Sequence, residues 1–250
     1  MKLETLPIIK QEPFFTDEER SFSKHNIQHI AIIPDGNRRW AKERSLPIVE
    51  GYLAGAQSLI KTSLAALELG IPVLTIYAFS TENWKRPKNE CDLIFELVDE
   101  HLQYYCSSLI ESNIRLHVIG DLNPLPQQLK QTIQEVTVKT ATATGLDLIL
   151  PINYGGRDEI VRAFKRLYQT GLFDNLKEED IQQALDTHAW PDPDLIIRTS
   201  GEQRLSNFLI WQSSYAENYT DSVLWPDFSP HHLLAAIETY NQRIRRRGGS

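Results

Sequence analysis

Apolar residues follow two periods along the chain from His29 onward. Short runs of branched apolar residues, typical of buried parallel strands, alternate with longer segments whose apolar residues recur every three to four positions, as in amphipathic helices. The strand-like runs are residues 29–33, 73–79, 115–120, 146–154, 195–199 and 208–211. The helical segments are residues 52–69, 91–110, 125–143, 157–168, 177–187 and 230–247. This alternation predicts a single α/β domain with a mostly parallel central sheet flanked by helices.

The first 24 residues do not continue this pattern. Charges are scattered through residues 1–24, without the continuous apolar core of a secretory signal. Phe14 and Phe15 offer a local docking point, but we expect residues 1–24 to form a flexible arm and residues 25–250 to form the domain. No apolar run approaches the roughly 20 residues that span a bilayer.

Composition narrows the classes of function. A hydrophobic content of 41% and a charged content of 24% are ordinary for a globular domain. The net charge of -7 argues against a general nucleic-acid binder. The two cysteines, Cys91 and Cys106, make no disulfide framework and favour reduced thiols in the cytoplasm.

Unusual polar residues follow four of the predicted strands. They lie in the runs 35–40, 78–87, 153–157 and 194–208, which hold carboxylates, arginines, glycines, small hydroxyl residues and two tryptophans. Because the carboxyl ends of parallel strands meet at one edge of a sheet, we expect these runs to lie together, where ligands of such sheets bind. Taken alone, the Asp35 turn would be only a strand end followed by a helix cap.

The residue types at this edge indicate an anion site with a metal. One arginine guanidinium donates two parallel hydrogen bonds to phosphate oxygens. Serine hydroxyls and glycine N–H groups complete a phosphate site. Mg²⁺ takes one or two carboxylates, which Asp35 with Glu217 or Glu202 would supply. The common nucleotide-binding glycine motifs are absent from the sequence. The neighbouring apolar residues are either core or the lining of a cavity for a lipid-like chain.

Taken together, the motifs resemble those of the cis-prenyltransferases, most closely the bacterial undecaprenyl diphosphate synthases. The matching runs begin at Asp35 (Asp-Gly-Asn-x-Arg-Trp-Ala) and at Tyr77 (Tyr-Ala-Phe-Ser-x-Glu-Asn-Trp-x-Arg-Pro). Further matches lie in residues 153–157, 194–208, 211–217 and 224–228. The resemblance covers residues 26–249.

The resemblance implies an enzyme that condenses isopentenyl diphosphate with an allylic diphosphate primer, usually farnesyl diphosphate, with formation of cis double bonds. It implies Mg²⁺ as cofactor, bound by Asp35 and Glu217, and Asn83 as the residue that assists proton removal beside the catalytic Asp35. The implied substrate-binding residues are Gly36, Asn37, Arg38, Arg39, Trp40, Ser80, Thr81, Glu82, Trp84, Arg86, Arg198, Arg204, Leu205 and Ser206.

The family also implies a homodimer and a cytoplasmic enzyme at the inner face of the membrane, into which the product partitions. That product is a cis-polyprenyl diphosphate, the undecaprenyl carrier-lipid precursor of cell-wall synthesis. An apolar tunnel between sheet and helices would hold the growing chain, and its depth would set the product's length.

The chain departs from the family pattern at three positions. Pro34 replaces a methionine, and Ile48 and Tyr52 stand where the bacterial enzymes carry arginine and histidine near the primer's diphosphate. We therefore expect weaker binding of the primer diphosphate, or compensation by a group such as Arg44.

Two other functions remain open at this point. Some relatives of this fold serve only as non-catalytic partners of an active subunit. A magnesium-dependent phosphohydrolase would also use an aspartate at a strand end, but would need a second acid close by, which the Asp35-Gly36-Asn37 turn lacks.

Overall fold

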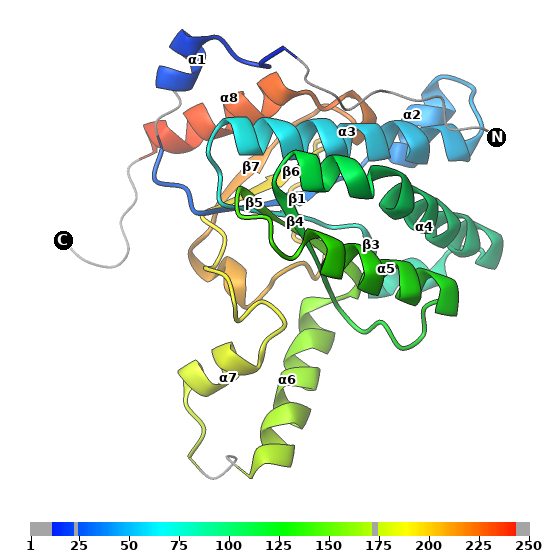
Figure 1. Ribbon diagram of the computed structural model, residues 1–250, viewed down its shortest axis with the longest axis vertical. Helices are drawn as coiled ribbons and strands as arrows, with labels where there is room; N and C mark the ends of the chain where they lie inside the picture. The colour runs from blue at the N-terminus through cyan, green and yellow to red at the C-terminus, as the bar shows by residue number, and fades with distance from the viewer. Residues whose placement is uncertain (1–11, 23–24, 172–174, 244–250) are drawn as a thin grey trace.

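Seven parallel strands form the centre of the molecule (Figure 1). The computed structural model describes residues 12–22, 25–171 and 175–243. The strands are β1 (His29–Ile33), β2 (Val73–Ile76), β3 (Phe79–Ser80), β4 (Ile114–Ile119), β5 (Leu146–Tyr154), β6 (Leu195–Arg198) and β7 (Glu217–Thr220). Their order is β4-β5-β2-β1-β6-β7, and the short β3 pairs with the end of β5. The predicted α/β fold with a parallel sheet is confirmed.

Helices cover this sheet and connect its strands. They are α1 (Asp17–Phe22), α2 (Asn37–Glu43), α3 (Ile48–Glu68), α4 (Lys88–Glu111), α5 (Gln127–Thr140), α6 (Gly156–Thr170), α7 (Glu178–Ala184) and α8 (Pro230–Gln242). Short 3₁₀ helices include η1 (Thr81–Lys85), η3 (Gln212–Tyr215) and η4 (Trp225–Asp227). Helices α6 and α7 project from the body as a pair (Figure 1).

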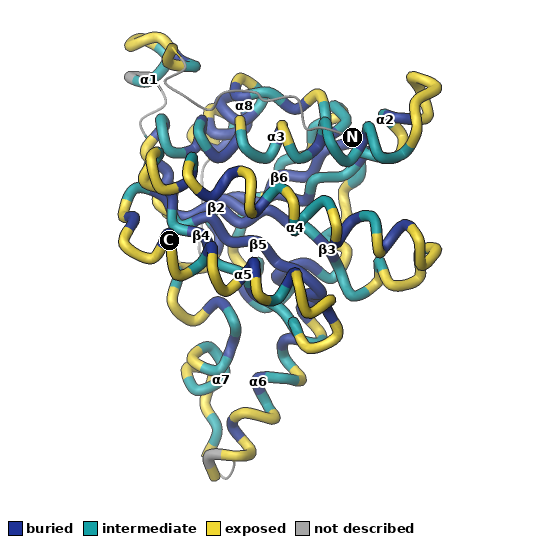
Figure 2. The backbone as a smooth tube through the Cα atoms, turned by 45° about the vertical axis from the view of Figure 1, so that its right-hand side comes forward, coloured by how far each residue is buried: buried dark blue, intermediate teal, exposed yellow. Residues whose placement is uncertain are grey.

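The central strands β1, β2, β5 and β6 are buried on both faces and lie in the dark central band of Figure 2. One face packs against α3, α4, α5 and α8 through residues such as Ile32, Leu74 and Leu148. The other face packs against the loops around Trp190, Leu205 and Phe208. Burial on both sides explains why the strands read as continuous apolar runs.

One predicted strand is wrong. Residues 208–211 form turns, and the edge strand lies instead at Glu217–Thr220. This edge strand pairs on one side only, and its residues alternate between half-buried and exposed because successive side chains point to opposite faces of the sheet. Its polar sequence therefore lacks the apolar run that predicts the other strands.

Residues 12–22, within the arm expected at residues 1–24, contact α3 and α8. The Glu68 carboxylate accepts the backbone N–H groups of Phe14 and Phe15, at 2.8 and 3.2 Å, and pairs with Arg20. The ring of Phe15 is 2% exposed and packs edge-on against His231 of α8. The ring of Phe15 and the carboxylate of Glu68, the last residue of α3, thus hold α1 against the domain. Residues 1–11 and 23–24 lie outside the described part.

Candidate active site

A polar cavity of about 760 Å³ opens at the carboxyl edge of the sheet. Its described lining holds five arginines and two carboxylates, Asp35 and Glu82, and therefore carries three more positive than negative charges. The arginines are Arg38, Arg39, Arg86, Arg157 and Arg198. This surplus suits a multiply charged anion such as a diphosphate.

Asp35 lies at the end of β1 and is fixed through its backbone. The Thr199 hydroxyl accepts the N–H of Asp35 at 2.8 Å and donates to its carbonyl at 2.6 Å. The Trp225 N–H donates to the same carbonyl at 3.0 Å. These bonds hold the turn at the cavity through its backbone, and the side chain of Asp35 is 30% exposed there.

Arg198 connects Asp35 to the loop that follows β6. Its Nη2 donates to Asp35 Oδ2 at 2.9 Å, and its Nη1 donates to Ser206 Oγ at 2.7 Å and to the carbonyl of Arg204. Arg198 is 6% exposed, and its buried Nε has no hydrogen-bond partner within the described residues. A buried donor without a partner is costly, so this atom is a ready contact for a bound anion or a water.

The turn after Asp35 brings α2 to the cavity. Gly36 has φ +120°, and a Cβ there would approach Leu224 to 3.0 Å, so the turn requires glycine. Asn37 lines the cavity with a buried Oδ1 that has no partner in the described structure. The Arg39 Nη2 donates to Ser200 Oγ at 2.6 Å and lies 3.6 Å from Asp35 Oδ1.

Segment η1 forms another wall. The Asn83 Oδ1 accepts the Ser80 N–H at 3.0 Å, which places both residues on the cavity. Burial raises the pKa of Glu82, but hydrogen bonds from Asn207, Ser80 and Thr81 outweigh it and hold that pKa below its usual value. Glu82 is therefore an anion that faces Asn207 at 2.9 Å.

Tyr52 occupies the junction of two cavities. Its hydroxyl donates to Glu90 Oε1 at 2.7 Å and accepts from Arg86 Nη1 at 2.8 Å. The same Glu90 oxygen has Arg86 at 3.3 Å and Arg38 at 3.8 Å. Burial, followed by the bond to Glu90, raises the pKa of Tyr52, so this hydroxyl stays neutral. Tyr52 therefore orients charged groups rather than adding a charge.

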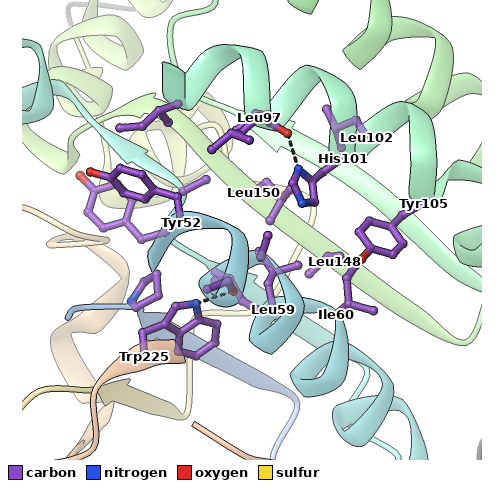
Figure 3. Close-up of a pocket in the computed structure, with 18 of the residues that line it drawn as sticks. Tyr52, Leu59, Ile60, Leu97, His101, Leu102, Tyr105, Leu148, Leu150 and Trp225 are labelled. Atoms are coloured by element: carbon purple, nitrogen blue, oxygen red, sulfur yellow. Dashed lines mark hydrogen bonds between the residues drawn. The ribbon is translucent and has the colours of Figure 1, made fainter. Parts of the chain in front are cut away.

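A second, apolar cavity of about 150 Å³ continues from this junction between α3, α4 and the sheet (Figure 3). Pro34, Asn37, Tyr52, Tyr77, Ala78 and Ile94 line both cavities. Figure 3 shows Leu59, Leu148 and Leu150 along the apolar one, with His101 and Tyr105 farther along α4. The His101 Nδ1 donates to the Leu97 carbonyl at 2.6 Å, which satisfies one polar atom of the ring.

Two of the predicted substrate-binding tryptophans do not line the polar cavity. The indole N–H of Trp40 donates to Asp227 at 2.7 Å, and that of Trp84 donates to Asn153 at 2.8 Å. Arg44 stacks on Trp40 and pairs with Asp227 at 2.9 Å, so the predicted compensation by Arg44 finds no support. These indoles support the walls of the site instead of facing its interior.

Other predicted residues lie behind the cavity or at its rim. Ile48 lines a separate groove beside α2. The positive charge of the arginine that the family carries at this position is therefore missing from that groove and not from the surroundings of Asp35. Arg204 is exposed and paired with Glu202. Leu205 packs against the apolar cluster on the far face of the sheet. Thr81 packs where a Cβ on Gly155 would lie.

Glu217 is not placed with Asp35. It begins β7 opposite Leu195, three residues before Arg198, which is about 10 Å along the strand. Its carboxylate instead pairs at 2.6 Å with Arg243, which follows α8. Glu217 begins its strand, whereas Asp35 follows the end of one, and the expectation that both carboxylates hold one ion stays a prediction.

Several residues that line or contact the cavities were not assigned from the sequence, Asn207 among them. Arg157 follows β5 and lines the polar cavity, and its position after a strand end was the available signal. Tyr77 lines both cavities, stacked on Phe208 at 4.5 Å. Glu90 is 7% exposed within a helix, and nothing in its local sequence distinguishes it from a surface carboxylate.

Comparison with known proteins agrees with this geometry. The model of a protein family described as "Putative undecaprenyl diphosphate synthase" matches residues 33–248. The chain belongs to this family. Isoprenyl transferase of Staphylococcus saprophyticus is 46% identical over 246 residues, which is 96% of each chain. The family's activity makes the protein a prenyltransferase.

Two solved structures are similar in fold. Lavandulyl diphosphate synthase from Lavandula x intermedia, solved with dimethylallyl diphosphate, has a TM-score of 0.86 and 35% identity, covering 93% of this chain and 100% of that chain. A probable undecaprenyl diphosphate synthase from Campylobacter jejuni has a TM-score of 0.78 and 38% identity, covering 90% and 100%.

Proposed function

We propose that the protein condenses isopentenyl diphosphate with an allylic diphosphate, in particular farnesyl diphosphate, and builds a cis-polyprenyl diphosphate. One observation carries the proposal: an arginine-rich cavity and an apolar cavity share six lining residues. A prenyl diphosphate has the same two parts, a charged head and an apolar chain, so a single ligand would occupy both.

The arginines would stabilise charge that develops during the reaction. When the allylic carbon–oxygen bond breaks, negative charge grows on the leaving diphosphate, and fixed guanidinium groups favour that state over the substrate. Arg38 and Arg39 lie on the α2 side of the cavity, and Arg198 and Ser206 lie on the other. Two diphosphates held side by side would react as an oriented pair.

We propose that Asn83 assists the loss of a proton. The new carbon–carbon bond leaves a cation that loses a proton to form the cis double bond. The Asn83 Oδ1 has one hydrogen bond, from the Ser80 N–H, which leaves its second lone pair for a proton-bearing carbon or a water in the cavity. The residue would orient this step, since an amide is a weak base.

The residues fit a magnesium ion shared with a diphosphate. Asp35 presents Oδ1 to the cavity, 3.6 Å from Arg39, while no group of three or more potential metal ligands occurs among the described residues. Mg²⁺ suits such a site because it takes few protein carboxylates and fills its shell with phosphate oxygens and water. When bound, it would neutralise charge on the leaving diphosphate.

The apolar cavity would receive the growing chain, with Leu59, Leu148 and Leu150 along its walls. We further propose that the product is the undecaprenyl precursor of a cell-wall carrier lipid, released to the membrane from a cytoplasmic homodimer. Across the described ranges, the helices are too short or too polar to cross a bilayer.

A labelling assay tests the proposal. The purified protein is incubated with radiolabelled isopentenyl diphosphate, farnesyl diphosphate and Mg²⁺, and extracted lipids are separated by length. We expect a labelled polyprenyl ladder that requires the primer. No condensation would favour a partner subunit, and phosphate release alone would favour a phosphohydrolase.

A further inference from the structure

Asn207 lies where three segments of the polar cavity meet. It follows Ser206 and has φ +62°, and Ser206 and Leu209 are also left-handed, with φ +50° and +43°. Left-handed backbone costs roughly 1 kcal/mol or more for a residue with a side chain, although asparagine tolerates it better than most. Contacts from other segments must therefore hold this loop.

Asn207 supplies the missing cap of α6. Its carbonyl accepts the Gly156 N–H at 2.7 Å, and its Oδ1 accepts the Arg157 N–H at 2.9 Å. The helix's own N-cap residue, Gly155, has no side chain with which to do so. Two of the free N–H groups at the start of α6 are thus satisfied from a distant loop, and Arg157 is fixed beside the cavity.

The remaining polar atom of Asn207 reaches the opposite wall. Its Nδ2 donates to Glu82 Oε1 of η1 at 2.9 Å. The orientation of the amide is determined, because the Arg157 N–H can only donate and must face the oxygen. A Cβ on Gly155 would lie 2.6 Å from both Asn207 Nδ2 and Thr81 Oγ1, so the three segments are in close contact.

We propose that Asn207 is a positioning residue that holds η1, with its Asn83, against the loop of Arg198 and Ser206. This inference rests on the proposed function and adds the contact that aligns the two walls of the site. Losing the Glu82 contact would let η1 move from that loop. The effect would fall on turnover and on the KM of isopentenyl diphosphate, more than on the KM of the allylic primer.

The decisive variant is Asn207→Asp. Its oxygen can still accept the Arg157 N–H, and its charge near the start of α6 is favourable, so Tm should not fall. Two carboxylates would now face each other at the Glu82 contact, and we expect kcat/KM for isopentenyl diphosphate to fall about 10-fold. Asn113→Asp is the matched control. It makes the same change at a left-handed asparagine (φ +58°) at the far edge of the sheet, bonded to Thr144.

Two double variants separate the hydrogen bond from the charge. In Asn207→Asp/Glu82→Gln the glutamine amide donates to the new aspartate, which restores the bond with reversed polarity. Asn207→Asp/Glu82→Ala has the same net charge but no donor. We expect kcat/KM to recover, relative to Asn207→Asp, only in the double variant that contains Glu82→Gln. Recovery with both doubles, recovery with neither, or an undiminished Asn207→Asp enzyme would overturn the inference.

The binding of inorganic diphosphate, measured by calorimetry on the wild type and these four variants, gives a second readout. We expect the affinities for inorganic diphosphate to rank the five proteins in the same order as their kcat/KM values. If the wild type forms no polyprenyl product, the proposed function fails, and these affinities alone decide the role of Asn207. Equal affinities for all variants would then reject it.

Discussion

At the scale of single residues, the site depends on side chains that make two contacts at once. Arg198 binds Asp35 with one guanidinium nitrogen and Ser206 with another, so one buried cation links two strand ends. Only arginine has donors arranged for both bonds. The geometry of Asp35 therefore depends on this neighbour as much as on its own turn.

Replacing the Asp35 carboxylate should abolish most of the activity. Asp35→Asn keeps the shape but removes the charge that faces Arg198 and any bound metal. We expect kcat to fall by about 100-fold or more, since electrostatic stabilisation of the transition state is lost. Steady-state kinetics measure this, with the exposed Asp92→Asn as control. A fall below about 5-fold would remove Asp35 from the mechanism.

Removing the Tyr52 hydroxyl should affect the primer. Tyr52→Phe leaves Glu90 with Arg86 but without its shortest hydrogen bond. A bond to a charged group contributes about 2 kcal/mol, which corresponds to about 30-fold in an equilibrium constant, so we expect the KM of farnesyl diphosphate to rise by up to about 30-fold. Tyr215→Phe, in which the ring is 76% exposed, is the control. An unchanged KM would show that this hydroxyl has no role in the primer site.

At the scale of elements, the strand ends brought the site together as the sequence predicts. Asp35, Ser80, Arg157 and Arg198 lie at or just after the ends of different strands and line one cavity, because parallel strands end at one edge. Glu217 could not be placed from the sequence, since a polar edge strand carries no apolar run to show where it begins. Nor could the directions of Trp40 and Trp84 be predicted, since they depend on Asp227 and Asn153, remote in sequence.

His29 connects β1 to its neighbours and should make stability depend on pH. Its Nδ1 donates to the Pro191 carbonyl and its Nε2 accepts from Thr75, each at 2.7 Å. Burial lowers the pKa of His29 to about 4. The unfolded chain therefore binds a proton below about pH 6.5 that the fold does not, and stability falls as the pH drops toward 4.

We expect this residue to remove about 2 kcal/mol of unfolding free energy between pH 8 and pH 5. His29→Asn keeps a donor near the Nδ1 position and does not titrate. Urea unfolding at both pH values should therefore give the variant a smaller difference between them. A pH dependence identical to that of the wild type would show that His29 is not the titrating group.

At the scale of the whole molecule, residues 12–22 pack against the domain. Phe15 is 2% exposed against α3 and α8, although the sequence around it predicts a loose arm. The reason is tertiary, because Glu68 and His231 provide its partners. Phe15→Ala should lower the free energy of unfolding by about 3 kcal/mol. Both substrate KM values should stay the same, because α1 is remote from the cavities. An unchanged urea midpoint would show that α1 does not stabilise the fold.

The identity of the product tests the central claim most directly. Mass spectrometry of the lipid formed from farnesyl diphosphate and isopentenyl diphosphate should show a primer extended by repeated five-carbon units. Nuclear magnetic resonance should show cis geometry in each added unit. A product extended with trans bonds, a primer that is only hydrolysed, or two unreacted substrates would contradict the account.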